Sequence, residues 1–486
     1  MRRIHVLLAL ALLPVAGCLD LGGGEDRPDY KQVQDEVALD AARVLLQDHG
    51  KADGHADAAL HRGGMNLEPV GYHNGVDDSG EPDRIPAQGY YTELAVTRNY
   101  AYLTRHSLDG SYGGFSIIDI RNPSSPAYVG GFSALGGADI EVSDDERLAF
   151  FATQRNTPEE LAGHGMAYQE PSTPRGIVIV DISDKAFPEQ AGFQPLPVNG
   201  PHTLSYLRHT DGGEYLLVCT YDLVTDPGTG AIVGAVPVTQ RVLVYRIERV
   251  PSSPVGPLPV DGVVLVPVSQ FQLTDSPPQG RLFFPHDAVP QVHPDGRVLL
   301  YVAYWDKGVQ IVDISDPASP VHVSGFTEFS PSSRNNVHQV RPFDEPIGGR
   351  HVTVTEPEII AADETGHFFF LDTTEPESPE KLGHWTLPGD LIVQSLEFSP
   401  HNFDTWDGKV ALAHNHAGLW VVDVGDEENL REPKTAAYYM PTPSRAESPR
   451  PQPYVWGVFE QRTAQGSLLF ASDEATGLHI LRYTGP

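Results

Sequence analysis

Four histidines occur in short segments of similar composition, each at the start of a mostly apolar run. The segments are GPHTL, FPHDA, NVHQV and SPHNF, and their histidines are His202, His286, His338 and His401. Neutral imidazole is the commonest metal ligand in proteins, and it suits zinc, copper, iron and nickel. If the four side chains meet, they could hold a transition metal such as copper or zinc, or bind another small ligand. The alternative is that each imidazole bonds main chain or water and only fills a polar channel.

Acidic, aromatic and further polar residues occupy related places in the rest of the chain. The positions equivalent to the histidines are Glu93 in YYTEL, Asp139 in GADIEV and Trp456 in YVWGV. The apolar run that follows such a segment often ends in polar residues, and from these we select as candidate ligand-binding residues Asp306, Glu356 and His416. Carboxylates beside imidazoles could also orient them as outer partners of a metal ion.

Several other kinds of chemistry have no motif in this sequence. There is no GxSxG nucleophile elbow and no GxxxxGK[S/T] phosphate loop. Cys219, in LLVCTY, is interpreted as a buried structural thiol, and His293, in VHPDGR, is expected to be exposed at a hairpin turn. The chain carries 65 Asp and Glu against 33 Lys and Arg, a formal charge of −32, with no run of basic residues. This composition argues against nucleic acid as a partner.

The fold must hold the candidate residues in place, and a repeated segment of the sequence indicates what that fold is. The stretch GVQIVDISDPASP, residues 308–320, is an apolar run that ends in an Asp-containing turn, and FSIIDIRNPSSP and IVIVDISDKAFP are close copies. Internal repetition of this kind is typical of propellers and solenoids. Related runs recur roughly 50 to 70 residues apart, as IIDI (117–120), IVDI (179–182), VYRI (244–247), IVDI (311–314), FFFLD (368–372), VVDV (421–424) and ILRY (480–483).

Each copy has the surroundings of a four-stranded antiparallel unit. Upstream lies a hairpin of two strands, joined in the fourth copy by HPDG, where glycine accepts a positive φ. Downstream follows a short strand such as PVHVSGF. Seven such units predict an all-β protein, a seven-bladed β-propeller over residues 65–486. The last unit ends after its third strand and residues 65–75 resemble an orphan fourth strand, so we predict that an N-terminal strand closes the ring.

The propeller prediction separates two groups of polar residues. In an antiparallel meander, the start of the first strand, the end of the second and the loop after it lie on one face. The long insertions 155–175 and 224–240 follow second strands too, so histidines, acids and loops should gather at one mouth of the central channel. The carboxylates of the repeated run lie far from the axis, where turn capping is a better interpretation than a metal-binding ring. They are Asp119, Asp181, Asp313, Asp372 and Asp423.

The N-terminal residues have the pattern of a targeting signal. A basic start, MRRIH, precedes an apolar stretch too short to span a bilayer well, and VAGC resembles a bacterial or archaeal lipobox. We therefore predict a lipoprotein signal peptide over residues 1–17, with lipid on Cys18, and the rival is an ordinary signal cleaved nearby. Residues 18–64 are predicted to form a tether with one amphipathic helix. The protein is then expected to be an extracytoplasmic monomer, anchored by lipid to the cell membrane, at the surface or in the periplasm.

Two family resemblances bear on these predictions. GIVIVDISD, GVQIVDISDPASP and GLWVVDV resemble the LVIVD-repeat family, which implies an extracytoplasmic propeller. Two copies depart from its motif, with Arg246 and Arg482 in place of Asp. More weakly, PHDA and the in-register histidines are similar to the selenium-binding protein and methanethiol oxidase propellers, which would imply copper at channel histidines. The cysteine motif of those propellers is not seen here.

Two functions follow from the sequence. The first is a ligand-binding or protein-interaction module that uses the His-rich mouth of the channel, with a small molecule or a protein as partner. The alternative is a transition-metal-dependent redox enzyme that uses the same histidines and is methanethiol-oxidase-like. The catalytic residues of such an enzyme stay unassigned.

Overall fold

The structure is a computed structural model, and it describes most of the chain beyond residue 63. The described residues are 64–76, 90–106, 113–134, 136–137, 139–154, 175–196, 200–225, 232–235, 239–250, 262–278, 281–329, 336–358, 367–387, 399–415, 417–441, 454–474 and 476–485. The predicted signal peptide (1–17), Cys18, the helix predicted within 18–64 and His416 lie outside them.

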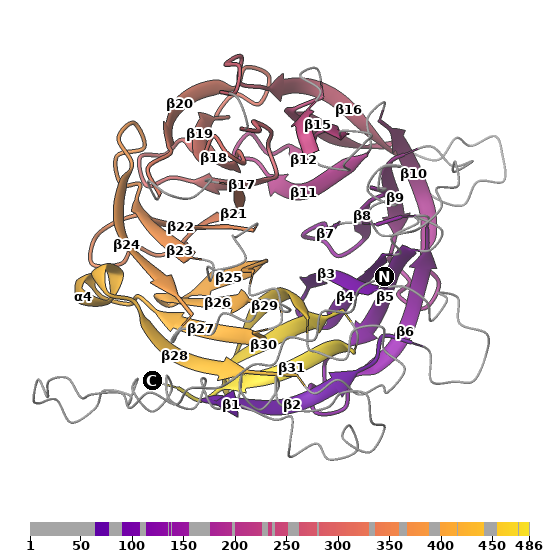
Figure 1. Ribbon diagram of the computed structural model, residues 1–486. Coiled ribbons are helices and arrows are strands. Elements are labelled where there is room, and N and C mark those ends of the chain that lie inside the picture. Colours follow the sequence, from indigo (N-terminus) through magenta and orange to yellow (C-terminus); the bar gives the residue numbers. More distant parts are fainter. Residues whose placement is uncertain are drawn as a thin grey trace, which may run out of the picture.

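In the described ranges the chain forms seven antiparallel blades arranged in a ring (Figure 1), as the repeat predicts. The first blade contains β3 (Tyr90–Val96), β4 (Tyr100–His106), β5 (Gly113–Asp119) and β6 (Ala127–Ser133). The second contains β7 (Ile140–Val142), β8 (Leu148–Ala152), β9 (Gly176–Asp181) and β10 (Glu189–Pro195). The third contains β11 (Pro201–Arg208), β12 (Glu214–Thr220), β15 (Arg241–Val250) and β16 (Gly262–Phe271). The fourth contains β17 (Asp287–Val292), β18 (Val298–Ala303), β19 (Val309–Asp313) and β20 (Val321–Phe326).

The remaining blades continue the same order. The fifth contains β21 (Val337–Pro342), β22 (Val352–Pro357), β23 (His367–Asp372) and β24 (Glu380–Thr386). The sixth contains β25 (Phe403–Trp406), β26 (Lys409–Ala413), β27 (Leu419–Asp423) and β28 (Lys434–Tyr439), with β1 (Gly64–Met65) added at its edge. The seventh contains β29 (Val455–Thr463), β30 (Gly466–Asp473), β31 (Gly477–Tyr483) and β2 (Leu67–His73). Outside the blades lie the strand pair β13 (Leu223–Thr225) and β14 (Ile232–Ala235) and the short helix α4 (Glu427–Arg431).

The seventh blade joins the two ends of the described chain. Its outer strand, β2, pairs with β31 in an antiparallel register that sets Leu67 opposite Tyr483 and His73 opposite Leu478. The C-terminal strand β31 therefore does not present a free edge on that side, which an unpaired strand would expose to other chains. In the described part of the chain there is also no helix with the length and apolar character that a membrane-spanning segment needs.

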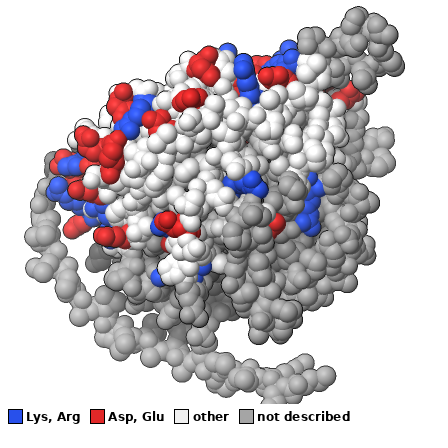
Figure 2. Space-filling view, turned by 90° about the horizontal axis from the view of Figure 1, so that it is seen from above, with Lys and Arg blue, Asp and Glu red and all other residues white. Residues whose placement is uncertain are grey.

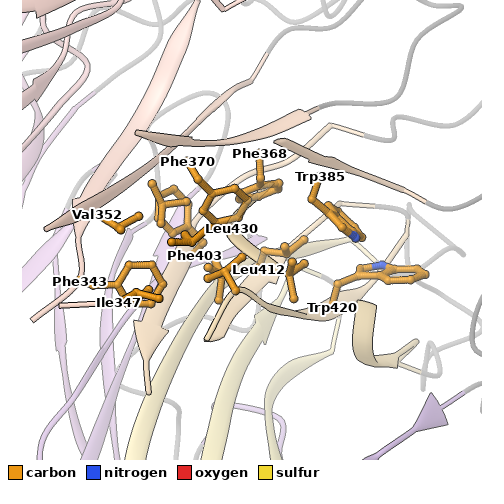
Figure 3. Close-up of a cluster of buried hydrophobic side chains, with 14 of the residues drawn as sticks. Phe343, Ile347, Val352, Phe368, Phe370, Trp385, Phe403, Leu412, Trp420 and Leu430 are labelled. Atoms are coloured by element: carbon orange, nitrogen blue, oxygen red, sulfur yellow. The ribbon is translucent and has the colours of Figure 1, made fainter. Parts of the chain in front are cut away.

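Stacking of neighbouring blades explains why the middle strands are so apolar. Every residue of β18 is buried, because the sheet is covered on both faces by its neighbours. Between the fifth and sixth blades the core contains large rings, among them Phe368, Trp385, Phe403 and Trp420 (Figure 3). Aromatic side chains of this size bury much apolar area in one place. These inter-blade cores hold the first strands, which lie nearest the axis, in a fixed position (Figure 1).

The carboxylates of the repeated run cap turns, as predicted. In each case Oδ1 accepts a hydrogen bond from the backbone N–H two residues later, at 2.8–3.0 Å. This geometry stabilises the turn after the third strand and needs no metal. The five residues are Asp119, Asp181, Asp313, Asp372 and Asp423.

The turns of one blade contact the next blade. The Oγ of Ser324, in β20, donates to the carbonyl of Pro376, in the turn of the fifth blade. In other blades glycine takes the corresponding place, and a Cβ on Gly130 would lie only 2.3 Å from the carbonyl oxygen of Lys185. A small residue is therefore required at this contact in the outer strand.

The prediction that His293 is exposed is wrong. Its side chain is buried, and its Nε2 lies 3.2 Å from the carbonyl oxygen of Thr373 in the next blade. Its ring also meets that of His351 at 4.9 Å. The physical reason is that the hairpin turn after the first strand packs against the neighbouring blade, which a single repeat does not reveal. Cys219, by contrast, is buried as predicted, and burial raises the pKa of its thiol well above the usual range.

Candidate functional site

One mouth of the central channel forms a cavity of about 570 Å³ that all seven blades line. Residues at or next to the start of each first strand contribute to its wall. In blade order these residues are Glu93, Asp139, His202, His286, His338, His401 and Trp456. The structure thus brings the seven candidates together, and their role in binding stays a prediction. The predicted equivalence of Asp139 to the histidines is wrong, because strand pairing sets Asp139 in the register of Asp287, one residue after His286.

The aromatic members of this set form a continuous arc. The ring centroids of His202 and His286 are 4.1 Å apart, and those of His286 and His338 are 4.3 Å apart. The next two distances are 4.3 Å from His338 to His401 and 4.0 Å from His401 to Trp456. Adjacent blades therefore place four imidazoles and one indole in successive ring contacts, tilted or T-shaped, along the cavity wall.

Each of the four imidazoles is held through Nδ1 by a protein group. The Nδ1 of His202 lies 2.6 Å from Oε1 of Gln154, and that of His286 lies 3.0 Å from the carbonyl oxygen of His338. The Nδ1 of His338 lies 2.8 Å from Oε1 of Glu356. The Nδ1 of His401 lies 3.0 Å from the carbonyl oxygen of Trp456. On the other side of the rings, the Nε2 atoms of His202 and His286 are 2.7 Å apart.

Burial keeps these imidazoles neutral. It lowers the pKa of His202 and of His401 to about 3, with the neighbouring His401 adding to the effect on His202. It also lowers the pKa of His286 and of His338 well below the usual range, and the other imidazoles of the arc act in the same direction. A neutral imidazole offers a lone pair, so the arc presents hydrogen-bond acceptors or metal ligands at physiological pH.

Carboxyl groups also line the cavity. The two oxygens of Asp139 accept from the N–H groups of Ile140 and Leu204 at 2.7 and 2.6 Å. Burial nevertheless raises the pKa of Asp139 to about 7, and it raises the pKa of Glu93 well above the usual range, with Asp139 as the next cause. Asp287 is buried, and its Oδ2 has no hydrogen-bond partner in the described residues.

Positive charge is scarce in this cavity. Among the described lining residues Arg341 is the single arginine. Its Nε lies 3.2 Å from Oδ1 of Asp404. Glu141 lines the same cavity, and burial followed by the charge of Asp139 raises its pKa well above the usual range. The wall therefore holds several carboxyl groups whose ionisation is opposed by their surroundings.

We expect Glu141→Gln to stabilise the protein at pH 8 and to have little effect at pH 5. A carboxyl group with a raised pKa keeps its proton in the folded state at pH values where the unfolded chain has lost it, so its contribution to stability falls as pH rises. The neutral amide removes this loss. A melting temperature higher by about 2 °C at pH 8 is the expected result. The exposed Glu345→Gln is the control, and equal shifts at both pH values would contradict the prediction.

The three remaining candidate residues do not line the described part of the cavity. Asp306 is buried but does not line the cavity, since its Oδ2 accepts from the N–H of Leu282 at 2.8 Å. Glu356 is fully buried behind His338 and orients its ring, as the outer-partner hypothesis allows. His416 lies outside the described residues.

Sequence reasoning missed several residues of the cavity. Gln154 holds His202, and Glu358 lines the cavity with its Oε2 4.0 Å from Nε2 of His286. Both follow the second strand of their blade, in the polar ends that the sequence does show, so the same criterion applied to every blade would have found them. Asp287 directly follows His286, but nothing in the sequence indicates that one of its oxygens is unpartnered.

Comparison with known protein families supports the repeat. The family model of the LVIVD repeat matches residues 88–133, 174–192 and 299–327, which contain the repeated runs of the first, second and fourth blades. No curated protein matches the chain.

Two solved structures are similar to the chain over much of its length. A functionally unknown protein from Desulfotomaculum acetoxidans is 12% identical, with 76% of this chain and 94% of that chain covered and a TM-score of 0.44. The periplasmic gluconolactonase of Pseudomonas aeruginosa is 13% identical, with 78% and 99% covered and a TM-score of 0.44. The resemblance to the selenium-binding protein family stays a prediction.

Proposed function

Because the chain is a β-propeller of the LVIVD-repeat family, we propose that it is a binding protein whose ligand enters the His-rich mouth of the central channel. The ligand that suits this mouth is a small molecule or ion that carries positive charge. We also propose that the protein works outside the cytoplasm, anchored by lipid on Cys18, which the lipobox-like VAGC segment supports. None of this requires catalysis.

The cavity has the dimensions of a small-molecule site. Its volume of about 570 Å³ lies within the range of roughly 300–1,000 Å³ that is usual for ligand pockets. Rigid first strands line it, and they are held by the inter-blade cores. Residues on such a scaffold can be kept in a fixed geometry for binding.

The observation that carries the proposal is the buried Oδ2 of Asp287, which has no partner in the described residues. Hydrogen bonds from the backbone N–H groups of Ala288 and Val340 lower the pKa of this carboxyl group, but burial outweighs them and raises it to about 6. A buried oxygen without a partner is costly, and a bound cation beside it would remove that cost. Glu93, Asp139 and Glu141 line the same cavity, with one arginine that already pairs with Asp404. The indole of Trp456, which also lines the cavity, offers a ring face that attracts cations.

The charge of the outer surface does not by itself select such a ligand. Figure 2 shows Lys and Arg interspersed with Asp and Glu on the described part of one face. Several of the basic residues pair with acids, for example Arg297 with Asp295 at 2.6 Å. The proposal therefore depends on the channel mouth and not on a surface patch.

Asp287→Asn is expected to weaken the binding of small cations at least tenfold, because it removes a buried negative charge at the mouth. Calorimetric titration of the full-length chain at pH 8 with spermidine, tetramethylammonium and arginine measures this, with gluconate and glucose as anionic and neutral comparators. Asp313→Asn makes the same chemical change in a turn outside the cavity and should leave binding unchanged. Equal binding by both variants, or preference for gluconate, would falsify the proposal.

A further inference from the structure

On three of the channel histidines, hydrogen bonding determines which ring nitrogen carries the proton. The Nδ1 atoms of His286 and His401 each face a backbone carbonyl oxygen, at 3.0 Å in both cases. A carbonyl only accepts, so Nδ1 must donate, and the lone pair of the neutral ring is then on Nε2. The tautomer of both rings follows from the main chain alone.

The ring of His338 has the same tautomer. Oε1 of Glu356 accepts from the backbone N–H of Gln339 at 3.2 Å and from Nδ1 of His338 at 2.8 Å. The partner of His202 is the side-chain amide of Gln154, 2.6 Å from its Nδ1, and an amide offers a donor or an acceptor according to its rotation, so this contact leaves both tautomers of His202 open. His286, His338 and His401 therefore have their lone pairs on Nε2.

The lone pair of His286 faces His202. The Nε2 atoms of His202 and His286 are 2.7 Å apart, a distance at which a proton normally lies between the atoms. Because Nε2 of His286 carries no proton, either Nε2–H of His202 donates to it or a cation lies beside the two nitrogens.

A second group of ligand atoms lies around the same histidine. One ligand atom each from His286, His338 and Glu358 can be chosen so that all lie within 4.8 Å of one another. Oε2 of Glu358 is 4.0 Å from Nε2 of His286, and its side chain is 30% exposed, toward the cavity it lines. Ligands of a tetrahedral zinc ion lie about 3.3 Å apart, because each bond is about 2.0–2.1 Å long. Small side-chain rotations would bring these atoms to that spacing.

The surroundings of His338 match a metal ligand. Its Nδ1 bonds the buried carboxylate of Glu356, and ligating histidines usually donate their other N–H to a carboxylate or a carbonyl. The Nδ1 of His286 donates in the same way to a backbone carbonyl oxygen, that of His338. Two imidazoles and one carboxylate with an open position form a donor set that suits zinc, copper and nickel.

We propose that His286 and His338, through Nε2, and Glu358, through its carboxylate, bind one divalent transition metal ion, with His202 placed to supply a fourth ligand. The proposal rests on the binding function proposed above, because the ion would be the cation bound at the mouth or the anchor of a larger ligand. It differs from the set of four histidines that the sequence suggests. The group of close ligand atoms contains Glu358 but neither His202 nor His401, and His202 enters the proposal only because its Nε2 is 2.7 Å from that of His286.

The test uses the purified full-length chain, freed of metal with a chelator and titrated with Zn²⁺, Co²⁺ and Cu²⁺. We expect one ion per chain, a visible Co²⁺ spectrum and nitrogen hyperfine structure in the Cu²⁺ EPR spectrum from at least two imidazoles. His286→Gln should abolish these signals, and Glu358→Gln, at a partly exposed side chain, should weaken binding at least tenfold. His322→Gln, at an exposed histidine that does not line the channel mouth, should bind like the parent chain.

Three results would overturn the metal site. The first is a metal content below a tenth of an ion per chain, and the second is equal metal affinity of the parent chain and the Glu358→Gln variant. The third is a chain that binds no metal and shows a strongly downfield NMR signal from a proton shared by His202 and His286. If spermidine or another organic cation still binds and Asp287→Asn still weakens it, the metal site alone has failed. If neither metal nor organic cation binds, the proposed function has failed too.

Discussion

Replacing Trp420 by alanine is expected to lower the free energy of unfolding by about 3–5 kcal/mol. The side chain is completely buried between the fifth and sixth blades (Figure 3). Its ring lies 5.8 Å from that of Trp385 and 5.3 Å from that of Tyr438. Its Nε1 donates to the carbonyl of Ala417 at 2.9 Å. Alanine would leave a large cavity between two closely packed sheets and an acceptor without its donor, and each adds to the loss.

Urea unfolding followed by circular dichroism measures this change. The matched control is Phe187→Ala, because that aromatic side chain is 58% exposed and its loss should cost less than about 0.5 kcal/mol. Trp420→Phe keeps much of the buried ring and should fall between the two. The interface between blades would not be a main source of stability if Trp420→Ala and Phe187→Ala unfolded at the same urea concentration.

This core also affects the site. His338 belongs to the fifth blade and His401 lies two residues before the first strand of the sixth, and their ring centroids are 4.3 Å apart. A cavity at Trp420 lets the two blades move relative to each other. We therefore expect that cation binding by the Trp420→Ala variant is weaker even under conditions where the protein remains folded.

Gly71→Val is expected to destabilise the protein by about 3 kcal/mol, at the upper end of the usual effect of overpacking. Gly71 lies in β2, which pairs with β31 to complete the seventh blade. A Cβ at this position would be 1.9 Å from the carbonyl oxygen of Pro123, in the turn of the first blade. The obstacle is backbone and not a flexible side chain, so the strand itself must move away.

The melting temperature and limited proteolysis of the N-terminal strand test this prediction. Gly262→Val is the control, because Gly262 also lies in an outer strand and a Cβ there would meet nothing within 4 Å. We expect faster cleavage around β2 in the Gly71 variant than in the control. If both variants melt and are cleaved alike, then β2 is not needed to hold the ring together.

The sequence is sufficient for the architecture. The copies of the GVQIVDISDPASP run, with a hairpin before each and a short strand after it, predict four-stranded units and their number. Those features depend on hydrogen bonds and turns within some tens of residues, so they leave a local pattern. The role of Asp313 and its equivalents follows in the same way, because the N–H that each carboxylate caps is only two residues along the chain. The repeat also places His202, His286, His338 and His401 in register.

The tertiary structure alone decides what those histidines can do. Their partners Gln154, Glu356 and Trp456 come from other strands, and in two of these cases from another blade. The approach of His202 to His286 and the place of Glu358 depend on side-chain rotamers at a junction of blades. The same holds for buried His293 and for Gly71, whose contacts lie in the next blade. A repeat pattern reports contacts within one unit, whereas contacts between units join residues far apart in the chain, and only the closed ring brings them together.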